Sequence, residues 1–115
     1  MKTFKQGLEV VMADKSWKAW ERRVAKYFGG QRRGADYGDR RGGKNDIIVA
    51  GFSIECKLLK RPTYQQMFDA CIQAENNSEN IIDIPIAVVK KNLQGLKDKD
   101  ALVVMRLGTF LDFFG

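Results

Sequence analysis

The sequence predicts a single α/β domain in which helices flank a mixed central β-sheet, in the order α-β-β-β-α-β-β. Two patterns predict this class. Apolar residues recur at helical spacing over 16–28 and 64–72, and strand-like apolar runs or alternations occupy 46–59, 84–90 and 101–107. The length of 115 residues, with 44% hydrophobic and 30% charged residues, suits one compact core.

The first predicted helix spans residues 16–28 and ends at Gly29-Gly30. Its apolar stripe includes Trp17 and Val24, and Glu21 lies one turn after Trp17 along that stripe. A carboxylate buried in such a stripe is costly unless it is paired or bound to a metal. Two alternatives stay open: Glu21 is buried and functional, or the helix is tilted and leaves Glu21 at the rim.

A loop rich in glycine and arginine is predicted at residues 29–45, with a short strand near 33–37. Its five basic side chains are Arg32, Arg33, Arg40, Arg41 and Lys44. Residues 15–61 as a whole hold thirteen Lys and Arg against five Asp and Glu, a net charge of +8. Such a surface favours a nucleic-acid partner, so we expect these five side chains to contact DNA phosphates. The alternative is that the charges are only solvated.

Residues 46–59 predict a β-hairpin that turns at Ala50-Gly51. This register places Asp46 opposite Glu55 and puts Lys57 on the same face as Glu55. Two facing carboxylates repel each other, and a divalent cation between them would reverse that effect. The hairpin therefore predicts a magnesium site. The alternative is an exposed polar face with a weak surface salt bridge.

The chain contains no histidine, which excludes His-based general bases and most zinc sites. Any catalysis must therefore use carboxylates, lysine and a hard metal ion. Cys56 and Cys71 have no metal-binding spacing and are predicted to be small buried hydrophobes. No secretory signal or membrane-spanning apolar run is present, so we expect a cytoplasmic protein without a membrane partner, in the host cytoplasm if it is phage-encoded.

A second helix is predicted to open at Pro62-Thr63, where Gln66 completes a capping box. Its predicted apolar stripe is Tyr64, Met67, Phe68, Cys71 and Ile72. The strands at 84–90 and 101–107 follow. An apolar tail, residues 110–114, then either forms an interface between two copies or packs on the core.

The combined pattern resembles the PD-(D/E)XK nuclease superfamily, most closely the archaeal-type Holliday junction resolvases and related phage nucleases. The residues that carry the resemblance are Asn45-Asp46, the run Ser53-Ile54-Glu55-Cys56-Lys57, and Glu21 in the preceding helix. It extends from Trp17 to Leu107, nearly the whole chain. Asn45 departs from the pattern, because many members have proline before the Asp.

The resemblance implies a restriction-endonuclease-like core, with residues 1–115 as one nuclease domain and residues 1–14 as an N-terminal extension. It also implies that Mg²⁺ or Mn²⁺ is held by Asp46, Glu55 and the backbone carbonyl of Cys56. Lys57 would activate the attacking water, and Glu21 would complete the site or ligate a second metal ion.

Some members carry a Gln-Ala pair in the helix after the lysine, and Gln73-Ala74 matches it, with Gln66 as the competing match. Gln73 is therefore a further candidate catalytic residue. The resemblance implies a Mg²⁺-dependent endodeoxyribonuclease that cuts branched DNA, such as Holliday junctions, as a homodimer. Two alternatives stay open: a nuclease of this type acting on linear, nicked or flapped DNA, and a non-catalytic DNA-binding module of the same fold.

Overall fold

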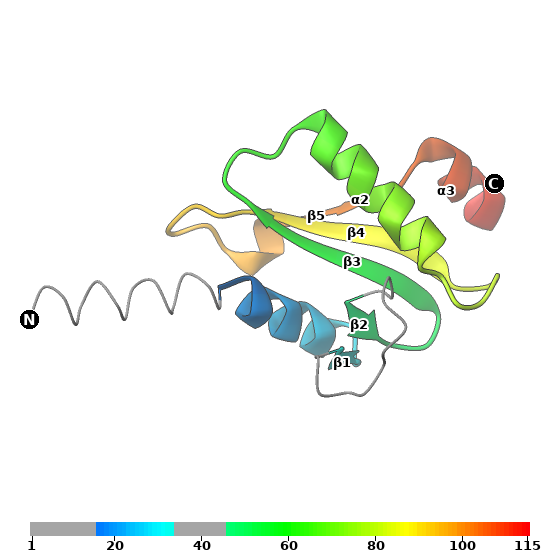
Figure 1. Cartoon of the computed structure of the whole chain (residues 1–115), viewed down its shortest axis with the longest axis horizontal. Helices are drawn as coiled ribbons and strands as arrows, with labels where there is room; N and C mark the ends of the chain where they lie inside the picture. The colour runs from blue at the N-terminus through cyan, green and yellow to red at the C-terminus, as the bar shows by residue number, and fades with distance from the viewer. Residues whose placement is uncertain (1–15, 34–45) are drawn as a thin grey trace, which may run out of the picture.

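The computed structural model describes residues 16–33 and 46–115, which form a five-stranded mixed sheet and three α-helices (Figure 1). Residues 16–27 are helical and are called the first helix below. The other elements are β1 (Gln31–Arg32), β2 (Ile47–Ile48), β3 (Phe52–Leu59), α2 (Tyr64–Asn76), β4 (Ile84–Lys91), the 3₁₀ helix η2 (Asp98–Asp100), β5 (Leu102–Val104) and α3 (Leu107–Phe114). The predicted α/β class and mixed sheet are confirmed.

The strands are arranged in the sheet in chain order, β1-β2-β3-β4-β5. β1, β2 and β3 are antiparallel neighbours, β3 and β4 are parallel, and β4 and β5 are antiparallel. α2 makes the crossover that two parallel strands require. In the hairpin, Ile47 pairs with Ile54, as a two-residue turn at Ala50-Gly51 predicts.

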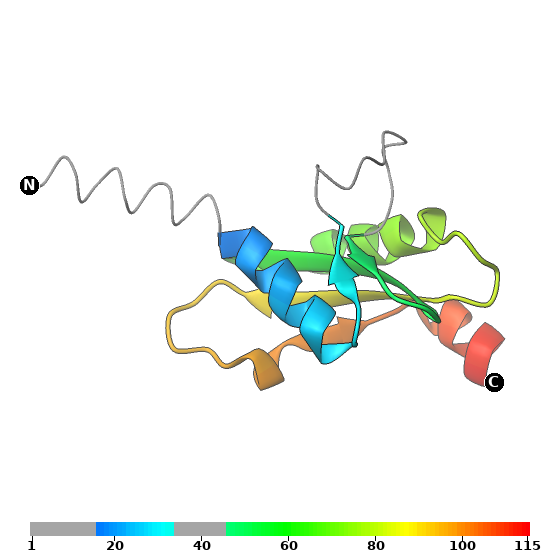
Figure 2. The ribbon, with the colours of Figure 1, turned by 90° about the horizontal axis from the view of Figure 1, so that it is seen from below.

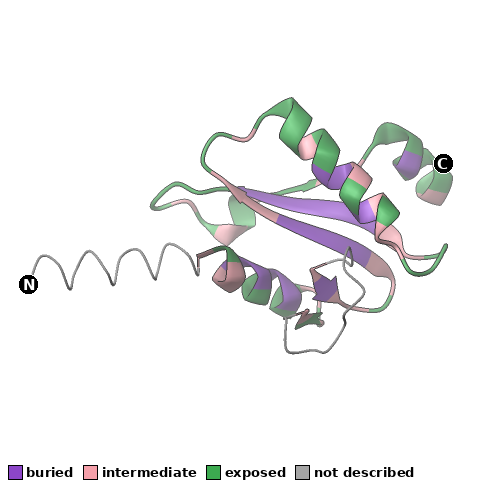
Figure 3. Cartoon of the chain, in the orientation of Figure 1, coloured by how far each residue is buried: buried purple, intermediate pink, exposed green. Residues whose placement is uncertain are grey.

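The central strands separate two apolar layers, because successive side chains of a strand point to opposite faces. On one face, Ile54 and Cys56 of β3 pack with Trp20 of the first helix. On the other face, Ala87 and Val89 of β4 pack against α2. Figure 2 shows the first helix and α2 on opposite sides of the sheet, and Figure 3 shows the buried residues concentrated along β3 and β4.

α2 begins as predicted, with Thr63 as the N-cap and Gln66 completing the capping box. Its buried face, however, is rotated from the predicted stripe. Ala70 and Ala74 are fully buried, whereas Tyr64 is 78% exposed. Small side chains let the helix backbone approach the sheet closely enough for the Ser53 hydroxyl to donate a hydrogen bond of 2.6 Å to the Ala74 carbonyl.

Most of the strand predicted near 33–37 lies outside the described residues. A short strand, β1, stands just before it, where Gly30 permits a close approach to β2. A Cβ atom on Gly30 would lie 2.5 Å from the Ile48 carbonyl oxygen. The strand predicted at 101–107 ends at Val104. Residues after it form α3.

α3 is anchored to α2 through the carboxylate of Glu75. Arg106 donates to it from Nε at 2.8 Å and from Nη2 at 2.6 Å, and the Thr109 hydroxyl donates at 2.9 Å. Phe110 and Leu111 remain about half exposed, so the apolar tail packs only partly on this chain. Within the described residues, no helix has the length and apolar character needed to cross a membrane.

Candidate active site

The predicted catalytic side chains gather where β2 ends beside β3. The described part of β2 pairs with β3 only at Ile47 and Ile54. From Glu55 onward, β3 has no strand partner on that side among the described residues. Asp46 stands just before β2, so its side chain lies at this open edge of β3.

Asp46 does not continue the predicted ladder. Its backbone N–H donates to the Ile54 carbonyl at 3.1 Å, and its carboxylate Oδ2 accepts a hydrogen bond of 2.9 Å from the Cys56 N–H. The Asp46 carboxylate thus accepts the hydrogen bond from Cys56 that the backbone carbonyl of a paired strand would otherwise accept. Asp46 is therefore beside Glu55, as predicted, but through its side chain and not through a regular cross-strand pair.

Glu55 is a buried carboxyl group with a polar partner on α2. It is 3% exposed, and its Oε1 accepts a hydrogen bond of 3.0 Å from Asn77 Nδ2. Burial and the negative charge of Asp46 together raise the pKa of Glu55 to about 7, against the opposing effects of Asn77 and Lys57. Glu55 therefore binds a proton more readily than an ordinary glutamate, and a bound cation would relieve its repulsion from Asp46.

Glu21 is buried, so it does not lie at the rim of the apolar stripe, and its functional role stays a prediction. It is 5% exposed, and its Oε1 accepts a hydrogen bond of 2.6 Å from Arg32 Nε. Burial and the charge of Asp46 raise the pKa of Glu21, while the charges of Arg32 and Lys57 oppose the rise. Arg32, which holds Glu21, pairs with Ile47 of β2, so Glu21 lies beside the segment that carries Asp46.

The donor set fits a hard divalent cation. Asp46 and Glu55 supply two adjacent carboxylates, and Mg²⁺ needs only one or two in addition to water. Among the described residues, no three Asp, Glu or Cys side chains come together in a group able to hold one metal ion. Glu21 is instead bonded to Arg32. The Cys56 thiol is buried and its pKa is raised by that burial, so only the backbone carbonyl of Cys56 suits the predicted role.

The predicted DNA-binding residues divide into two groups. Arg32 and Arg33 are ion-paired in the structure, Arg32 with Glu21 at 2.6 Å and Arg33 with Glu79 at 3.3 Å. Arg32 also lies over the Trp17 ring, 5.6 Å from its centre. Arg40, Arg41 and Lys44 lie outside the described residues.

Asn77 is the site residue that the sequence did not reveal. Its position was predictable, because an Asn-Asn-Ser run is typical of a helix end, and Asn77 is indeed the C-cap of α2. Its contact with Glu55 was not predictable, since it depends on how α2 crosses the sheet. Gln73, the predicted catalytic residue of this helix, is exposed one turn earlier, and its carbonyl accepts from the Asn77 N–H.

No family model, curated protein sequence or solved structure matches this chain. The chemistry of the residues at this edge is therefore the basis for assigning a function. This edge holds two acidic groups that repel each other, a lysine on the same strand and a second buried glutamate. Together these groups can bind a cation and orient a water molecule.

Proposed function

We propose that the protein is a metal-dependent endodeoxyribonuclease of the PD-(D/E)XK type, with a restriction-endonuclease-like core. The observation that carries the proposal is the close pair of the half-buried Asp46 and the buried Glu55 at the open edge of β3, with Lys57 two residues along the same strand. Two neighbouring carboxylates, one of them buried, destabilise a protein unless a proton or a cation separates the charges. A purely structural role would not explain why these two carboxyl groups lie so close together.

In this proposal Asp46, Glu55 and the Cys56 carbonyl hold Mg²⁺ or Mn²⁺. The ion would supply Lewis acidity and lower the pKa of a bound water. The Asn77 amide fixes the Glu55 carboxylate by donating to Oε1, which orients the other oxygen. The Cys56 N–H does the same for Asp46 through Oδ2.

Lys57 has the chemistry to act on the reacting phosphate. Its ammonium group carries three donors, which would hold the attacking water or a non-bridging oxygen of the phosphate. A cation in this position also stabilises the negative charge that develops as the phosphodiester bond breaks. Glu21 would accept a hydrogen bond from the same water and so orient it.

The substrate proposal is branched DNA, cut by a homodimer. The resemblance of the sequence pattern to junction resolvases supports the choice of substrate. The apolar surface left exposed on α3 supports a second copy as partner. Assays on four-way junction, flap, nicked and linear DNA side by side would test the choice, and a preference for linear ends would favour the alternative nuclease.

The catalytic proposal is tested by replacing Glu55 with Gln, which keeps the shape of the side chain and removes its charge. We expect cleavage in Mg²⁺ to fall by about 100-fold or more, the scale of losing one transition-state contact, while DNA binding in EDTA is retained. Asp69→Asn is the matched control, because Asp69 is an exposed carboxylate of α2 bonded only to Gln65 among the described residues. Undiminished cleavage by Glu55→Gln would refute the assignment. Absence of metal binding and cleavage in the unaltered protein would leave a non-catalytic DNA-binding module.

A further inference from the structure

The last helix, α3, turns its apolar side chains away from its own chain. Four of them recur at the spacing i, i+3, i+4 and i+7, which places them on one face of the helix. This α3 stripe consists of Leu107, Phe110, Leu111 and Phe114, and each of the four is between 46% and 72% exposed. The one buried residue of α3 is Thr109, and Figure 3 shows most of the helix as exposed. A helix that buries its polar side and exposes its apolar side has the pattern of an interface.

The stripe is held in place by polar contacts on the other side of the helix. The Thr109 hydroxyl and the Arg106 guanidinium both donate to the Glu75 carboxylate of α2. The hydrogen bonds from Arg106 hold the pKa of Glu75 below its ordinary value, so this carboxylate stays ionised at neutral pH. The exposure of the stripe is therefore built into the fold and does not result from a loose chain end.

An apolar groove of about 520 Å³ lies beside the stripe, between α2, β5 and α3. Its lining includes Tyr64 and Phe68 of α2 and Leu102 of β5. The one charged lining residue, Arg106, is bonded to Glu75. Because packed proteins leave few apolar hollows of this size unfilled, the groove is suited to convex apolar side chains from outside the single chain.

One residue belongs to both surfaces. Leu107 is the first residue of the stripe and also lines the groove, so the two surfaces are continuous. A two-fold axis beside Leu107 would therefore place the stripe of each copy on the groove of the other. We propose that the protein forms a two-fold dimer in which the α3 stripe of each copy fills the apolar groove of its partner. This inference rests on the homodimer of the proposed function and names the surface that forms it.

The apolar surface available is of the size that a dimer needs. The exposed fractions of Tyr64, Phe68, Phe110 and Phe114 add up to about 2.2 complete side chains, or roughly 330–550 Å² at about 150–250 Å² for each. A standard interface buries about 800 Å² per partner, and about 65% of a homodimer interface, or roughly 520 Å², is apolar. The exposed leucines of the stripe and the groove add to the aromatic area. Together the two surfaces can therefore supply the apolar core of a dimer interface.

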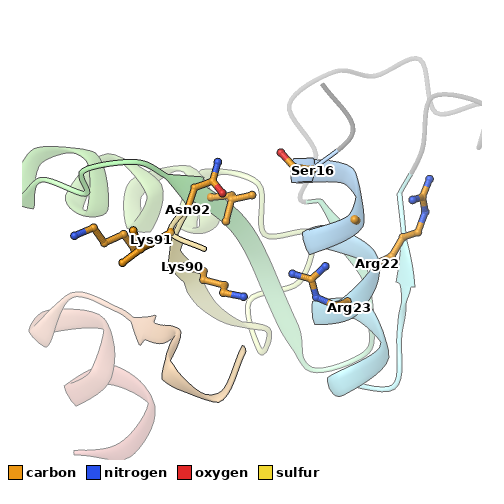
Figure 4. A pocket seen from close by; sticks show the side chains of 9 residues that line it. Ser16, Arg22, Arg23, Lys90, Lys91 and Asn92 are labelled. Atoms are coloured by element: carbon orange, nitrogen blue, oxygen red, sulfur yellow. The ribbon is translucent and has the colours of Figure 1, made fainter. Parts of the chain in front are cut away.

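Charge also favours the groove as the place where two copies meet. The pocket of about 400 Å³ beside the first helix has four cations in its wall, Arg22, Arg23, Lys90 and Lys91 (Figure 4). Asp98 binds only two of them, Arg23 and Lys90, so the pocket keeps a net positive charge. Two such pockets would repel each other, whereas the apolar groove carries no uncompensated charge among its lining residues.

The test first disables each surface by charge. The stripe variant, Phe110→Glu/Phe114→Glu, and the groove variant, Tyr64→Lys/Leu102→Lys, change only side chains that are exposed in the single chain. We expect each variant to raise the dimer dissociation constant by about 100-fold or more, because each change puts an unpaired charge into an apolar contact and two-fold symmetry applies it twice. Sedimentation velocity in EDTA, without DNA, measures the constant, and urea unfolding shows that each variant is folded.

The matched control is Leu93→Lys/Gln94→Lys. Both residues are exposed in the loop between β4 and β5, at the opposite end of the sheet from α3 (Figure 1). This variant adds two lysines outside the groove and should dimerise like the unaltered protein.

Mixing the stripe and groove variants then tests which surface contacts which. In their heterodimer, one contact pairs the glutamates of one copy with the lysines of the other, and the second contact is unaltered in both copies. We expect the heterodimer to be at least about 10-fold tighter than either variant's self-association. The stripe variant should pair less tightly with the control variant, whose lysines have no glutamates opposite them.

Three results would overturn the proposal. If the unaltered protein is monomeric at every concentration, the apolar face serves another partner. If the groove variant dimerises normally, the dimer packs stripe against stripe. If the mixture forms no heterodimer, the stripe and the groove do not meet. Because these measurements use neither metal nor DNA, each such failure leaves the Glu55→Gln cleavage test unaffected, and loss of the nuclease assignment would leave the dimer standing.

Discussion

At the scale of single residues, the most informative group is the Glu55 carboxyl, because its environment favours the uncharged form. The pKa of Glu55 is about 7 in the folded protein, above the ordinary value of 4.5. Between these values the folded state binds more protons than the unfolded state, so its stability falls as the pH rises. Burial acts on Glu21 in the same direction.

We therefore expect the metal-free protein to lose roughly 2–3 kcal/mol of unfolding free energy between pH 5 and pH 8. Urea unfolding in EDTA across that range would measure it. Glu55→Gln should show a clearly flatter profile, with the remaining slope due to Glu21. Addition of Mg²⁺ should stabilise the unaltered protein more at pH 8 than at pH 5. A metal-free stability that rises over this range would contradict the assigned environment of Glu55.

The residue scale also shows what sequence reasoning can and cannot predict about a site. Asp46, Glu55 and Lys57 were predictable, because the spacing of a hairpin and the alternation of a strand bring them together. The Glu21–Arg32 ion pair was not, since both side chains are long and their meeting depends on where β1 lies. Arg32, predicted as a DNA contact, is bonded to Glu21 in the structure, and its contact with DNA stays a prediction.

At the scale of elements, α2 illustrates how packing selects the buried face of a helix. Hydrophobicity favours the burial of Tyr64 and Phe68. The face of the helix that packs on the sheet instead carries Ala70 and Ala74. The two aromatic rings instead stack on each other, with their centres 6.2 Å apart. The helix start was predictable from capping chemistry, which is local, whereas the buried face depends on the depth of the space above β4.

This packing predicts that Ala70→Leu destabilises the protein strongly. Ala70 is completely buried against β4, so three added carbon atoms force the helix away from the sheet. The expected cost is about 1–3 kcal/mol in urea unfolding. Gln73→Leu, on the exposed face of the same helix, is the control and should change stability by less than about 0.5 kcal/mol. Equal stability of the two variants would show that α2 is seated differently.

At the scale of the whole molecule, charge and apolar surface lie in different places. A basic pocket beside the first helix has Arg22, Arg23, Lys90 and Lys91 in its wall, whereas a groove of about 520 Å³ between α2, β5 and α3 is lined by apolar residues and Arg106. Tyr64, Leu102 and Leu107, which line this groove, are between 57% and 78% exposed. A dimer formed at the groove would leave the basic pocket of each copy free for DNA.

The proposed homodimer therefore predicts that Leu102→Ser/Leu107→Ser shifts the protein toward monomer. Sedimentation velocity over a range of concentrations would measure the shift. Both side chains are more than half exposed, so the fold of the single chain should be little affected. Leu93→Ser, an exposed leucine that lines the basic pocket, is the control and should leave the dimer intact. An unaltered protein that is monomeric at every concentration would remove the dimer from the proposal.

The order of the elements was predictable at this scale, because each strand and helix carries its own pattern. α3 was not, since its anchor is the long-range bond from Arg106 to Glu75 and no local signal marks it. The closeness of the first helix to the open edge of β3 was also beyond local reasoning. It follows from the way Trp20 and Val24 fill the layer above Ile54.

The Arg32 guanidinium cannot neutralise Glu21 and a DNA phosphate fully at the same time. If DNA is the substrate, a phosphate that draws Arg32 away would leave Glu21 as an unpaired buried anion under the influence of Asp46, and the edge of β3 would attract a cation more strongly. We therefore expect Ca²⁺, which takes the same oxygen ligands, to tighten DNA binding in the unaltered protein but not in Arg32→Gln. Equal dependence on Ca²⁺ in both would exclude this coupling. By the reciprocity of linked equilibria, DNA would tighten cation binding by the same factor, so the metal ion would be held firmly only when substrate is present.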